Sequence, residues 1–239
     1  MKINDINSLN ILVNKSSLNK FKILHISDLH INKKTDILSI KKLINLCETI
    51  DYDILVITGD IIDCKAIAIK DKLELLNSLK NAYYISGNHD LFYGLKDLKD
   101  ILNEIIFLDN KIEFLEFNNE KIALAGLSDR FSKFFRIKRN EKSLLDLLVK
   151  CENRILLAHQ PKDYTYAVKN NVDVFLCGHT HGGQIYPFHY VVKLVQPFLS
   201  GLHYINKTAI YVNKGIGTWG IDFRYKANSE ITLLNLVYN

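Results

Sequence analysis

The sequence is poor in the features that mark several other classes of protein. Its 239 residues include only 3 proline and 11 glycine residues, which argues against low-complexity linkers, and no internal repeat recurs at the periods of solenoid folds. No window approaches the ~18 continuous apolar residues of a membrane-spanning helix, and the first six residues lack the basic and apolar regions of a secretory leader. We therefore expect a cytoplasmic protein and leave peripheral contact with a membrane open.

Cysteine is scarce as well, and its spacing argues against the common cysteine-based sites. Cys47, Cys64, Cys151 and Cys177 lie far apart and form no C-x-x-C pair. Nothing in the sequence suggests an oxidising compartment, in which disulfides persist. We interpret all four residues as buried thiols.

Size and charge bound the class of protein further. With 48% hydrophobic and 24% charged residues the chain can bury a large core, and we expect a single domain over residues 1–239. Lys and Arg exceed Asp and Glu by 31 − 26 = +5, which favours anionic partners without forming a dense basic stripe. Nucleic acid is therefore not indicated as a partner.

Apolar runs and helical patterns alternate along the chain. The runs at 21–26, 53–57 and 82–85 suit buried strands, and apolar residues recur at helical spacing over 36–50 and 66–80. Polar residues follow each run, which is typical of a layered α/β sheet whose loops converge on a site. Further strands are expected at 3–13, 112–117, 121–127, 154–158 and 172–176, further helices at 95–104, 143–150 and 163–169, and a second sheet completed by 209–212 and 231–237. We predict an α/β fold in which a two-sheet β-sandwich is flanked by helices.

The polar residues at the strand ends form a ligand set for metal ions. Carboxylates, imidazoles and an amide together suit one or two borderline-to-hard divalent cations rather than a thiolate zinc site. Two ions are the natural count, because about four protein ligands per ion with one shared carboxylate require about seven groups. The candidates are Asp28, His30, Asp60, Asn88, His89, His159, His179 and His181.

Glycines accompany these candidates. Gly59 precedes Asp60, Gly87 precedes Asn88 and Gly178 precedes His179. Because glycine tolerates close contacts and irregular backbone, we expect the chain to approach the ions closely at these points.

The order and spacing of five short motifs resemble the calcineurin-like metallophosphoesterase superfamily. The resemblance covers roughly residues 21–190, and the motifs are modest singly but specific together. They are Asp28-x-His30, Gly59-Asp60, Gly87-Asn88-His89-Asp90, the lone His159, and Gly178-His179-x-His181. The segments 181–185, 211–217 and 230–233 look like the bacterial branch that includes YkuE- and YaeI-type phosphodiesterases and lipid A pathway hydrolases.

This resemblance implies an αββα architecture and a role for each residue. One ion would be held by Asp28, His30 and His181, the other by Asn88, His159 and His179, and Asp60 would bridge them. Metal-activated hydroxide would then hydrolyse a phosphodiester or pyrophosphate bond, with Mn favoured among Mn, Fe, Zn and Mg. His89 would stabilise the transition state or protonate the leaving oxygen, and Asp90 would orient its imidazole.

Two segments keep two interpretations each. Residues 129–142 interleave basic residues with phenylalanines and form either a solvated helix and loop or a flap that faces phosphate or a membrane. Residues 185–202, within a wider segment at 185–205, are unusually apolar for a connection that leaves an active site, and either cover the core or face substrate or a bilayer. A lipid-linked phosphodiester is therefore one candidate substrate, beside small molecules.

Two other functions, and non-ligand roles for several residues, are also compatible with the sequence. The chain could be a UDP-2,3-diacylglucosamine pyrophosphatase, or a non-catalytic scaffold on the same fold, although no expected ligand position is missing. A lone histidine such as His159 is by itself more often a turn or core residue. We interpret the other histidines and nearby acids as core, capping or solvated groups: His25, His189, His203, Asp51, Asp53 and Asp63.

Overall fold

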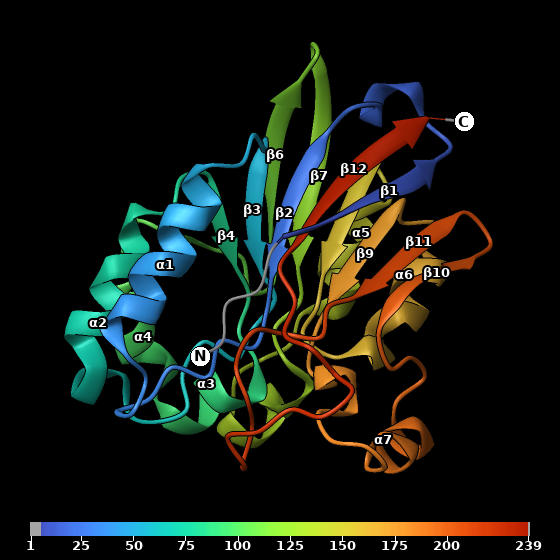
Figure 1. Cartoon of the computed structure of the whole chain (residues 1–239). Coiled ribbons are helices and arrows are strands. Elements are labelled where there is room, and N and C mark those ends of the chain that lie inside the picture. The colour runs from blue at the N-terminus through green and yellow to red at the C-terminus, as the bar shows by residue number, and fades with distance from the viewer. Residues whose placement is uncertain (1–5, 239) are drawn as a thin grey trace.

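Two six-stranded mixed sheets pack face to face in the computed structural model, which describes residues 6–238 (Figure 1). The first sheet has the order β1 (Asn7–Val13), β12 (Thr232–Tyr238), β2 (Lys22–Ile26), β3 (Ile54–Ile57), β4 (Ala82–Tyr84) and β5 (Ile106–Phe107). The second has the order β10 (Gly201–Ile205), β11 (Thr208–Val212), β9 (Val174–Cys177), β8 (Asn153–Leu157), β7 (Glu120–Gly126) and β6 (Lys111–Phe117). The predicted two-sheet fold is confirmed.

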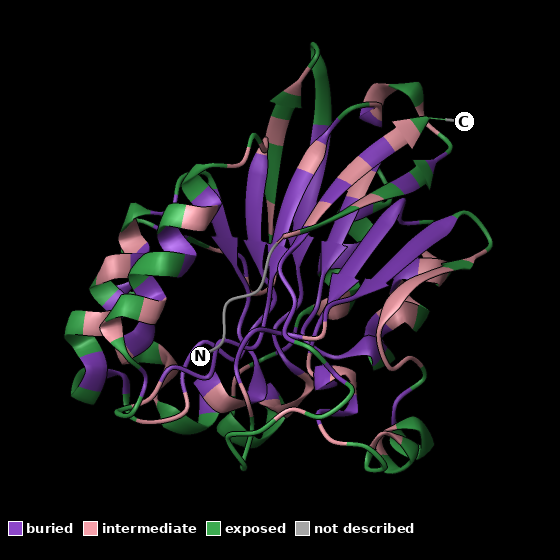
Figure 2. Ribbon diagram, viewed as in Figure 1, coloured by how far each residue is buried: buried purple, intermediate pink, exposed green. Residues whose placement is uncertain are grey.

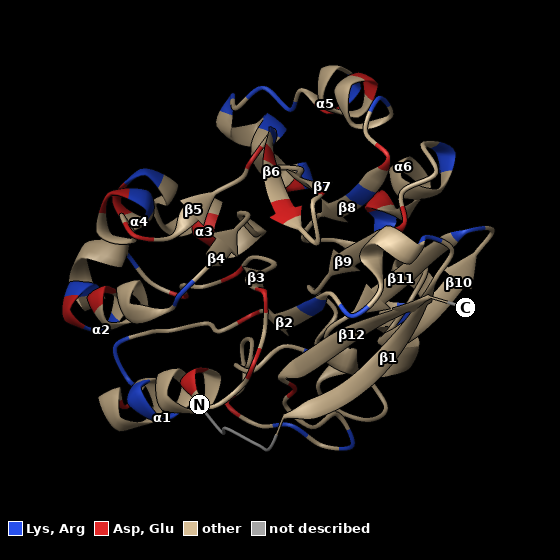
Figure 3. Cartoon of the chain, turned by 90° about the horizontal axis from the view of Figure 1, so that it is seen from above, with Lys and Arg blue, Asp and Glu red and all other residues tan. Residues whose placement is uncertain are grey.

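Side chains alternate between the two faces of each strand, which creates three hydrophobic clusters. In β2, Leu24 and Ile26 pack outward against helices, whereas Ile23 packs between the sheets. The outer face of the first sheet is covered by α1 (Ile37–Glu48), α2 (Lys70–Glu74) and α4 (Leu95–Ile101), and that of the second by α5 (Glu141–Leu148) and α6 (Tyr164–Lys169). The strands are largely buried in Figure 2, and the outward sides of the helices carry mixed charges in Figure 3.

Local sequence explains the main turns and helix ends. Asp36 caps α1, where its side chain accepts a hydrogen bond from the Leu38 amide at 3.1 Å. Asn118 and Asn119, with φ of 52° and 64°, form the two-residue turn between β6 and β7. Asparagine tolerates this left-handed conformation, so the predicted hairpin forms without a glycine.

Two of the predicted elements form differently, and α3 (Asn88–Tyr93), α7 (His189–Val195), β5 and β10 were not predicted. The helix expected at 66–80 is broken into a 3-10 turn (Ala66–Ile69), α2 and a second 3-10 turn (Leu75–Ser78). The tighter turn places both Ala66 and Ile69 on one buried face. The last strand, β12, lies in the first sheet between β1 and β2 and does not complete the second sheet.

The cysteine interpretation holds for two of the four residues. All four thiols are free, but only Cys47 and Cys177 are buried, while Cys64 and Cys151 are partly exposed. Burial raises the pKa of Cys47 to about 12, which keeps this thiol protonated and unreactive.

Strand direction sets the position of the candidate ligands. β2, β3 and β4 run parallel in the first sheet, and β8 and β9 run parallel in the second. The loops that follow these strands carry the predicted ligands and lie at the lower end of the molecule in Figure 1. Both sheets therefore deliver side chains to a shared site at this end.

Candidate metal centre

The candidate ligands form two neighbouring groups. One contains Asp28, His30 and His181, and within it one ligand atom from each residue lies within 4.8 Å of the others. The second contains Asp60, His159 and His179 and meets the same criterion. The structure thus brings together six predicted ligands from four separate loops.

The first group joins the loops after β2 and β9. The Nε2 atoms of His30 and His181 are 3.1 Å apart, and Nε2 of His181 lies 3.4 Å from Oδ1 of Asp28. The other oxygen of Asp28 accepts hydrogen bonds from Ser27 Oγ at 2.6 Å and the His179 amide at 3.0 Å. This leaves Oδ1 turned toward the two imidazoles.

The second group joins the loops after β3, β8 and β9. Oδ2 of Asp60 lies 3.2 Å from Nε2 of His159, which is itself 3.1 Å from Nδ1 of His179. The same Asp60 oxygen is 3.8 Å from Nε2 of His30. Asp60 therefore lies between the two groups, where a shared carboxylate is expected.

The hydrogen bonds at this centre fit divalent cations. Nδ1 of His159 lies 2.7 Å from the carbonyl oxygen of Thr58 and can only donate to it, so in the neutral ring Nε2 carries a lone pair toward the Asp60 carboxylate. Two acceptors at this distance repel each other unless a proton or a cation lies between them. Oδ1 of Asn88 is buried and has no hydrogen-bond partner among the described residues, although such oxygens are normally satisfied.

Burial and charge set the protonation of the imidazoles. Burial lowers the pKa of His30 to about 3 and that of His179 to about 4, which keeps both rings neutral as metal ligands must be. Burial opposes protonation of His159 too, but the adjacent Asp60 carboxylate outweighs it and raises the pKa of His159 well above its ordinary value. Burial would raise the pKa of Asp60, yet His159 and His30 hold it below its usual range. A cation bound here would take the place of the His159 proton.

The backbone at the centre is strained and crowded. Left-handed φ angles of 46° to 73° occur at Asp28, His30, Asp60, His179 and His181, a conformation that is uncommon for residues other than glycine. A Cβ atom on Gly87 would lie 2.1 Å from Oδ1 of Asp60, and one on Gly178 would lie 2.4 Å from Oδ2 of Asp28. The backbone therefore approaches the Asp60 and Asp28 carboxylates closely at these two glycines.

The calcineurin-like phosphoesterase family model matches residues 21–183, the stretch that carries all these loops. The chain belongs to this family. A metallophosphoesterase of Helicobacter pylori is 33% identical over 229 residues, and the YkuE metallophosphoesterase of Bacillus subtilis is 31% identical over 229 residues. These alignments cover 91% and 90% of this chain, and 60% and 79% of the respective relatives. The chain spans about 60% of the length of the Helicobacter relative.

Solved structures of low identity show the same fold. The NAD nucleotidase of Haemophilus influenzae superposes with a TM-score of 0.58 at 18% identity, covering 82% of this chain and 45% of that protein. The Plasmodium inner membrane complex anchor GAP50 gives 0.57 at 14% identity, covering 89% and 79%. Among the relatives, a Danio rerio protein that is 29% identical over 231 residues, with 90% of this chain and 53% of that protein aligned, is named a transmembrane protein with a metallophosphoesterase domain. Within residues 6–238 of this chain, no helix has the length and apolarity needed to cross a bilayer.

The predicted partner of His89 is wrong. In this metallophosphoesterase the Asp90 carboxylate faces the backbone, where it accepts hydrogen bonds from the amides of Gly87 and Asp60, each at 2.8 Å, and of Ile61. Asp90 thus supports the backbone of the loops that carry the ligands. Its contact with backbone amides reflects its position inside the first turn of α3 (Asn88–Tyr93).

Asp63 holds the position that Asp90 was expected to fill. Its Oδ1 lies 2.8 Å from Nδ1 of His89, and the His89 and His30 rings meet edge to face at 4.6 Å. The sequence predicts a capping or solvated role for Asp63, and the contact with His89 corrects this interpretation. Its place three residues after Asp60, on the same loop as a ligand, is the signal that sequence reasoning passed over.

Further buried side chains support the first ligand group. His25 lies 2.9 Å from Thr58 Oγ1, which donates to Ser27 Oγ at 2.8 Å, and Ser27 in turn donates to Asp28. The core or supporting role expected for His25 is confirmed. This chain of hydrogen bonds fixes the Asp28 carboxylate from behind.

Arg224 is a supporting residue that the sequence motifs did not reveal. Its guanidinium donates to the carbonyl oxygen of Lys214 at 2.9 Å and of Gly215 at 3.1 Å, and one of its nitrogens lies 3.1 Å from Nδ1 of His181. Burial lowers the pKa of Arg224 to about 10, so that it remains charged at neutral pH. It joins the loop after β11 to His181, the second histidine of the motif Gly178-His179-Thr180-His181 (GHTH).

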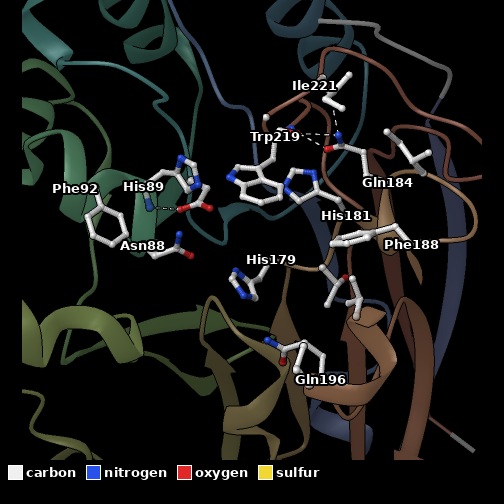
Figure 4. Close-up of a pocket in the computed structure, with 17 residues that line it drawn as sticks. Asn88, His89, Phe92, His179, His181, Gln184, Phe188, Gln196, Trp219 and Ile221 are labelled. Atoms are coloured by element: carbon white, nitrogen blue, oxygen red, sulfur yellow. Dashed lines mark hydrogen bonds between the residues drawn. The ribbon is translucent and has the colours of Figure 1, made fainter. Parts of the chain in front are cut away.

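A cavity of about 740 Å³ adjoins the ligands. Asn88, His89 and Phe92 lie on one side of it, and Phe188 and Ile221 on the other (Figure 4). The remaining lining is largely apolar and comes from the segment after the GHTH motif and from the loop between β11 and β12: Gly183, Gln184, Ile185, Val192, Val195, Gln196, Trp219 and Gly220.

The segment at 185–205, which the sequence predicts as a loop, contains regular secondary structure. It contains α7 (His189–Val195) and β10, and its first half lines the cavity through Ile185, Phe188 and Val192. Gln184 ties it to the loop after β11, because its side chain donates to the carbonyl oxygens of Trp219 at 2.8 Å and Ile221 at 3.0 Å. The part of this segment up to Val195 therefore forms a wall of the cavity and does not simply cover the core.

Proposed function

We propose that this metallophosphoesterase uses two divalent ions to hydrolyse a phosphodiester or pyrophosphate bond in a substrate with a long apolar group. The observation that carries the proposal is the apolar cavity, which opens directly on the ligands Asp60, His179 and His181. A substrate whose phosphate lies at the ligands would place a neighbouring substituent against Phe188, Val192 and the rest of the apolar wall.

The charge of the cavity supports a diester or pyrophosphate rather than a terminal monoester. None of the described residues that line it is Lys or Arg. The extra negative charge of a terminal phosphate would be poorly compensated beyond the ions themselves, and unpaired buried charge is costly. An internal phosphate carries less charge and has a second substituent that can bury apolar surface.

The proposed chemistry divides between the ions and His89. Bound ions would supply Lewis-acid stabilisation of the phosphoryl oxygens and a water of lowered pKa. Asp28, His30 and His181 would hold one ion, Asn88, His159 and His179 the other, and Asp60 would contact both. His89 lines the cavity, and Asp63 occupies its Nδ1, so Nε2 remains to protonate the departing oxygen.

The main alternative is a scaffold that keeps the fold without catalysis. Its expected signature is the loss of ligands, whereas the two groups in this chain are complete and their backbone is held in a strained conformation. Mn, Fe, Zn and Mg all accept oxygen and imidazole ligands. Of these four ions we propose manganese.

A series of alkyl p-nitrophenyl phosphodiesters tests the proposal. With manganese present, we expect kcat/KM to rise at least about tenfold from the methyl to the octyl ester, because each buried methylene contributes about 0.8 kcal/mol when fully removed from water. Val192→Asp should flatten this dependence. Val191→Asp is the matched control, because Val191 is 49% exposed and is not among the lining residues. A flat series in the unchanged protein would refute the apolar substrate.

A second panel addresses the reaction itself. It compares p-nitrophenyl phosphate, bis-p-nitrophenyl phosphate, a phospholipid and UDP-2,3-diacylglucosamine. We expect the diesters or the pyrophosphate to be cleaved faster than the monoester. Preference for the monoester would assign the enzyme to the phosphomonoesterases.

A further inference from the structure

The mouth of the cavity is surrounded by exposed apolar side chains. α7 has no buried residue at all, although a helix of a globular protein normally buries an apolar stripe. Its exposed apolar side chains are Tyr190 at 58%, Val191 at 49%, Leu194 at 86% and Val195 at 57%. The rest of the described chain therefore leaves most of the apolar surface of α7 uncovered.

The loop at 217–226 continues this surface. Trp219, Ile221, Phe223 and Tyr225 are 51%, 65%, 55% and 49% exposed. The loop is joined to the segment before α7, since the amide of Tyr186 donates to the carbonyl oxygen of Tyr225 at 3.2 Å and Lys226 lies over the Tyr186 ring at 4.6 Å. The two segments therefore form one platform.

A third segment, 130–138, borders the opposite side of the mouth. Phe134 is 79% exposed, and Phe131 and Phe135 pack against Phe92 with ring centroids 5.9 Å and 5.3 Å apart. Phe92 is itself a lining residue of the cavity and 56% exposed. Apolar surface thus runs from the outside of the protein, through the rim, to the ligands.

These three segments hold the excess positive charge of the chain. Residues 130–138, 185–195 and 217–226 contain seven basic residues and one acidic residue, Asp222. The rest of the chain has 31 − 7 = 24 basic and 26 − 1 = 25 acidic residues and is nearly neutral. Five of the seven basic side chains are exposed: Lys133, Arg136, Lys138, Lys193 and Lys226.

We infer that this end of the protein docks on an anionic lipid bilayer, with α7 and the 217–226 loop inserted at the level of the headgroups. Exposed leucine and phenylalanine would enter the acyl boundary, tryptophan and tyrosine would lie at the interface, and lysine and arginine would contact anionic headgroups. The cavity mouth would then face the membrane, so that an amphiphilic substrate could move from the bilayer to the ligands. Docking requires neither ions nor turnover and stands or falls separately from the proposed reaction.

Two matched double variants test the docking. Leu194→Glu with Phe223→Glu places acidic residues on α7 and the 217–226 loop, at side chains that do not line the cavity. Leu38→Glu with Phe114→Glu changes residues that are 69% and 59% exposed on α1 and β6, two elements that contribute no residue to the cavity lining. Circular dichroism and thermal unfolding check that both variants fold like the unchanged protein.

Cosedimentation with vesicles is the measurement. We expect the unchanged protein and the Leu38/Phe114 variant to bind phosphatidylcholine vesicles that contain phosphatidylglycerol, and to bind pure phosphatidylcholine or high-salt samples at least fivefold more weakly. The Leu194/Phe223 variant should bind at least fivefold more weakly to the anionic vesicles while it cleaves bis-p-nitrophenyl phosphate in solution as the unchanged protein does.

Three outcomes would overturn the inference. The unchanged protein could fail to bind anionic vesicles, or both double variants could bind alike. The third is that size-exclusion chromatography with light scattering shows an oligomer that only the Leu194/Phe223 substitutions dissociate, which would assign the face to a second copy of the chain. If the unchanged protein hydrolyses its substrate but does not bind vesicles, the docking alone is refuted. If the unchanged protein binds vesicles but hydrolyses nothing, the proposed reaction alone is refuted.

Discussion

Asp63 Oδ1 lies 2.8 Å from Nδ1 of His89, and this contact gives the imidazole one orientation at the edge of the cavity. A carboxylate that accepts from one ring nitrogen fixes the tautomer and the orientation of the ring. Asp63 is thus a positioning residue for the proposed proton donor.

Asp63→Asn should lower kcat roughly tenfold to a hundredfold with little change in KM, because general-acid catalysis contributes about 10² to 10⁴ in rate and the asparagine retains part of the orientation. The loss should be larger for a diester with an alkoxide leaving group than for one with p-nitrophenolate, which departs without protonation. Equal losses on both substrates would show that Asp63 acts only on the structure. His89→Ala should show the same leaving-group dependence while metal content is retained.

Asp60→Ala should abolish hydrolysis of bis-p-nitrophenyl phosphate and lower the metal content measured by inductively coupled plasma mass spectrometry. Asp60 lies between the two ligand groups, so both lose a carboxylate oxygen. Asp51→Ala is the control, because the Asp51 side chain is 90% exposed and pairs with Lys22. Undiminished turnover in the Asp60 variant would rule out the two-ion assignment.

Asp109 predicts a pH dependence of stability away from the metal ligands. Burial raises the pKa of Asp109 to about 6, although hydrogen bonds from Ser86 favour the charged form. The folded state therefore binds this proton more tightly than the unfolded state, whose Asp pKa is about 3.9. Stability from this group is fully present below about pH 4 and is lost as the pH rises to about 6.

Asp109→Asn isolates this effect. Relative to the variant, the unchanged protein should lose about 3 kcal/mol of unfolding free energy between pH 4 and pH 7, measured by urea denaturation at each pH. The comparison of the two proteins cancels the titration of the histidine ligands. A difference that stays constant with pH would contradict the assignment.

Arg224→Gln should lower the unfolding free energy by about 2–4 kcal/mol, because it leaves several buried carbonyl oxygens without their charged donor. It should also weaken metal binding through the loss of support behind His181. Lys226→Gln, an exposed change on the same loop, should leave both properties unchanged. Thermal unfolding with and without added manganese separates the two effects.

The sequence predicts the fold and the grouping of the candidate ligands because both follow from local patterns. Apolar runs followed by Asp28, Asp60 and His159 identify strands whose carboxyl ends must meet when the strands are parallel. Glycines before Asp60 and Asn88 indicated crowding that the structure contains. These signals need no knowledge of the rest of the fold.

Other features depend on contacts between distant segments, and the sequence could not specify them. The choice between Asp63 and Asp90 as partner of His89 depends on the direction of the first turn of α3, which points the Asp90 carboxylate at the β3 loop. Arg224 meets His181 from 43 residues away along the chain. The position of β12 depends on its pairing with both β1 and β2, which lie more than 200 residues before it in the chain.

The two ligand groups each take side chains from both sheets. Asp28, His30 and Asp60 follow strands of the first sheet, while His159, His179 and His181 follow strands of the second. Ions bound at both groups would link the two sheets at one end of the molecule. Their binding would stabilise the folded state relative to the unfolded state. Neither sheet contains a complete group by itself, so the two sheets must pack together before metal can bind. Removal of the ions by a chelator would therefore destabilise the interface between the sheets first.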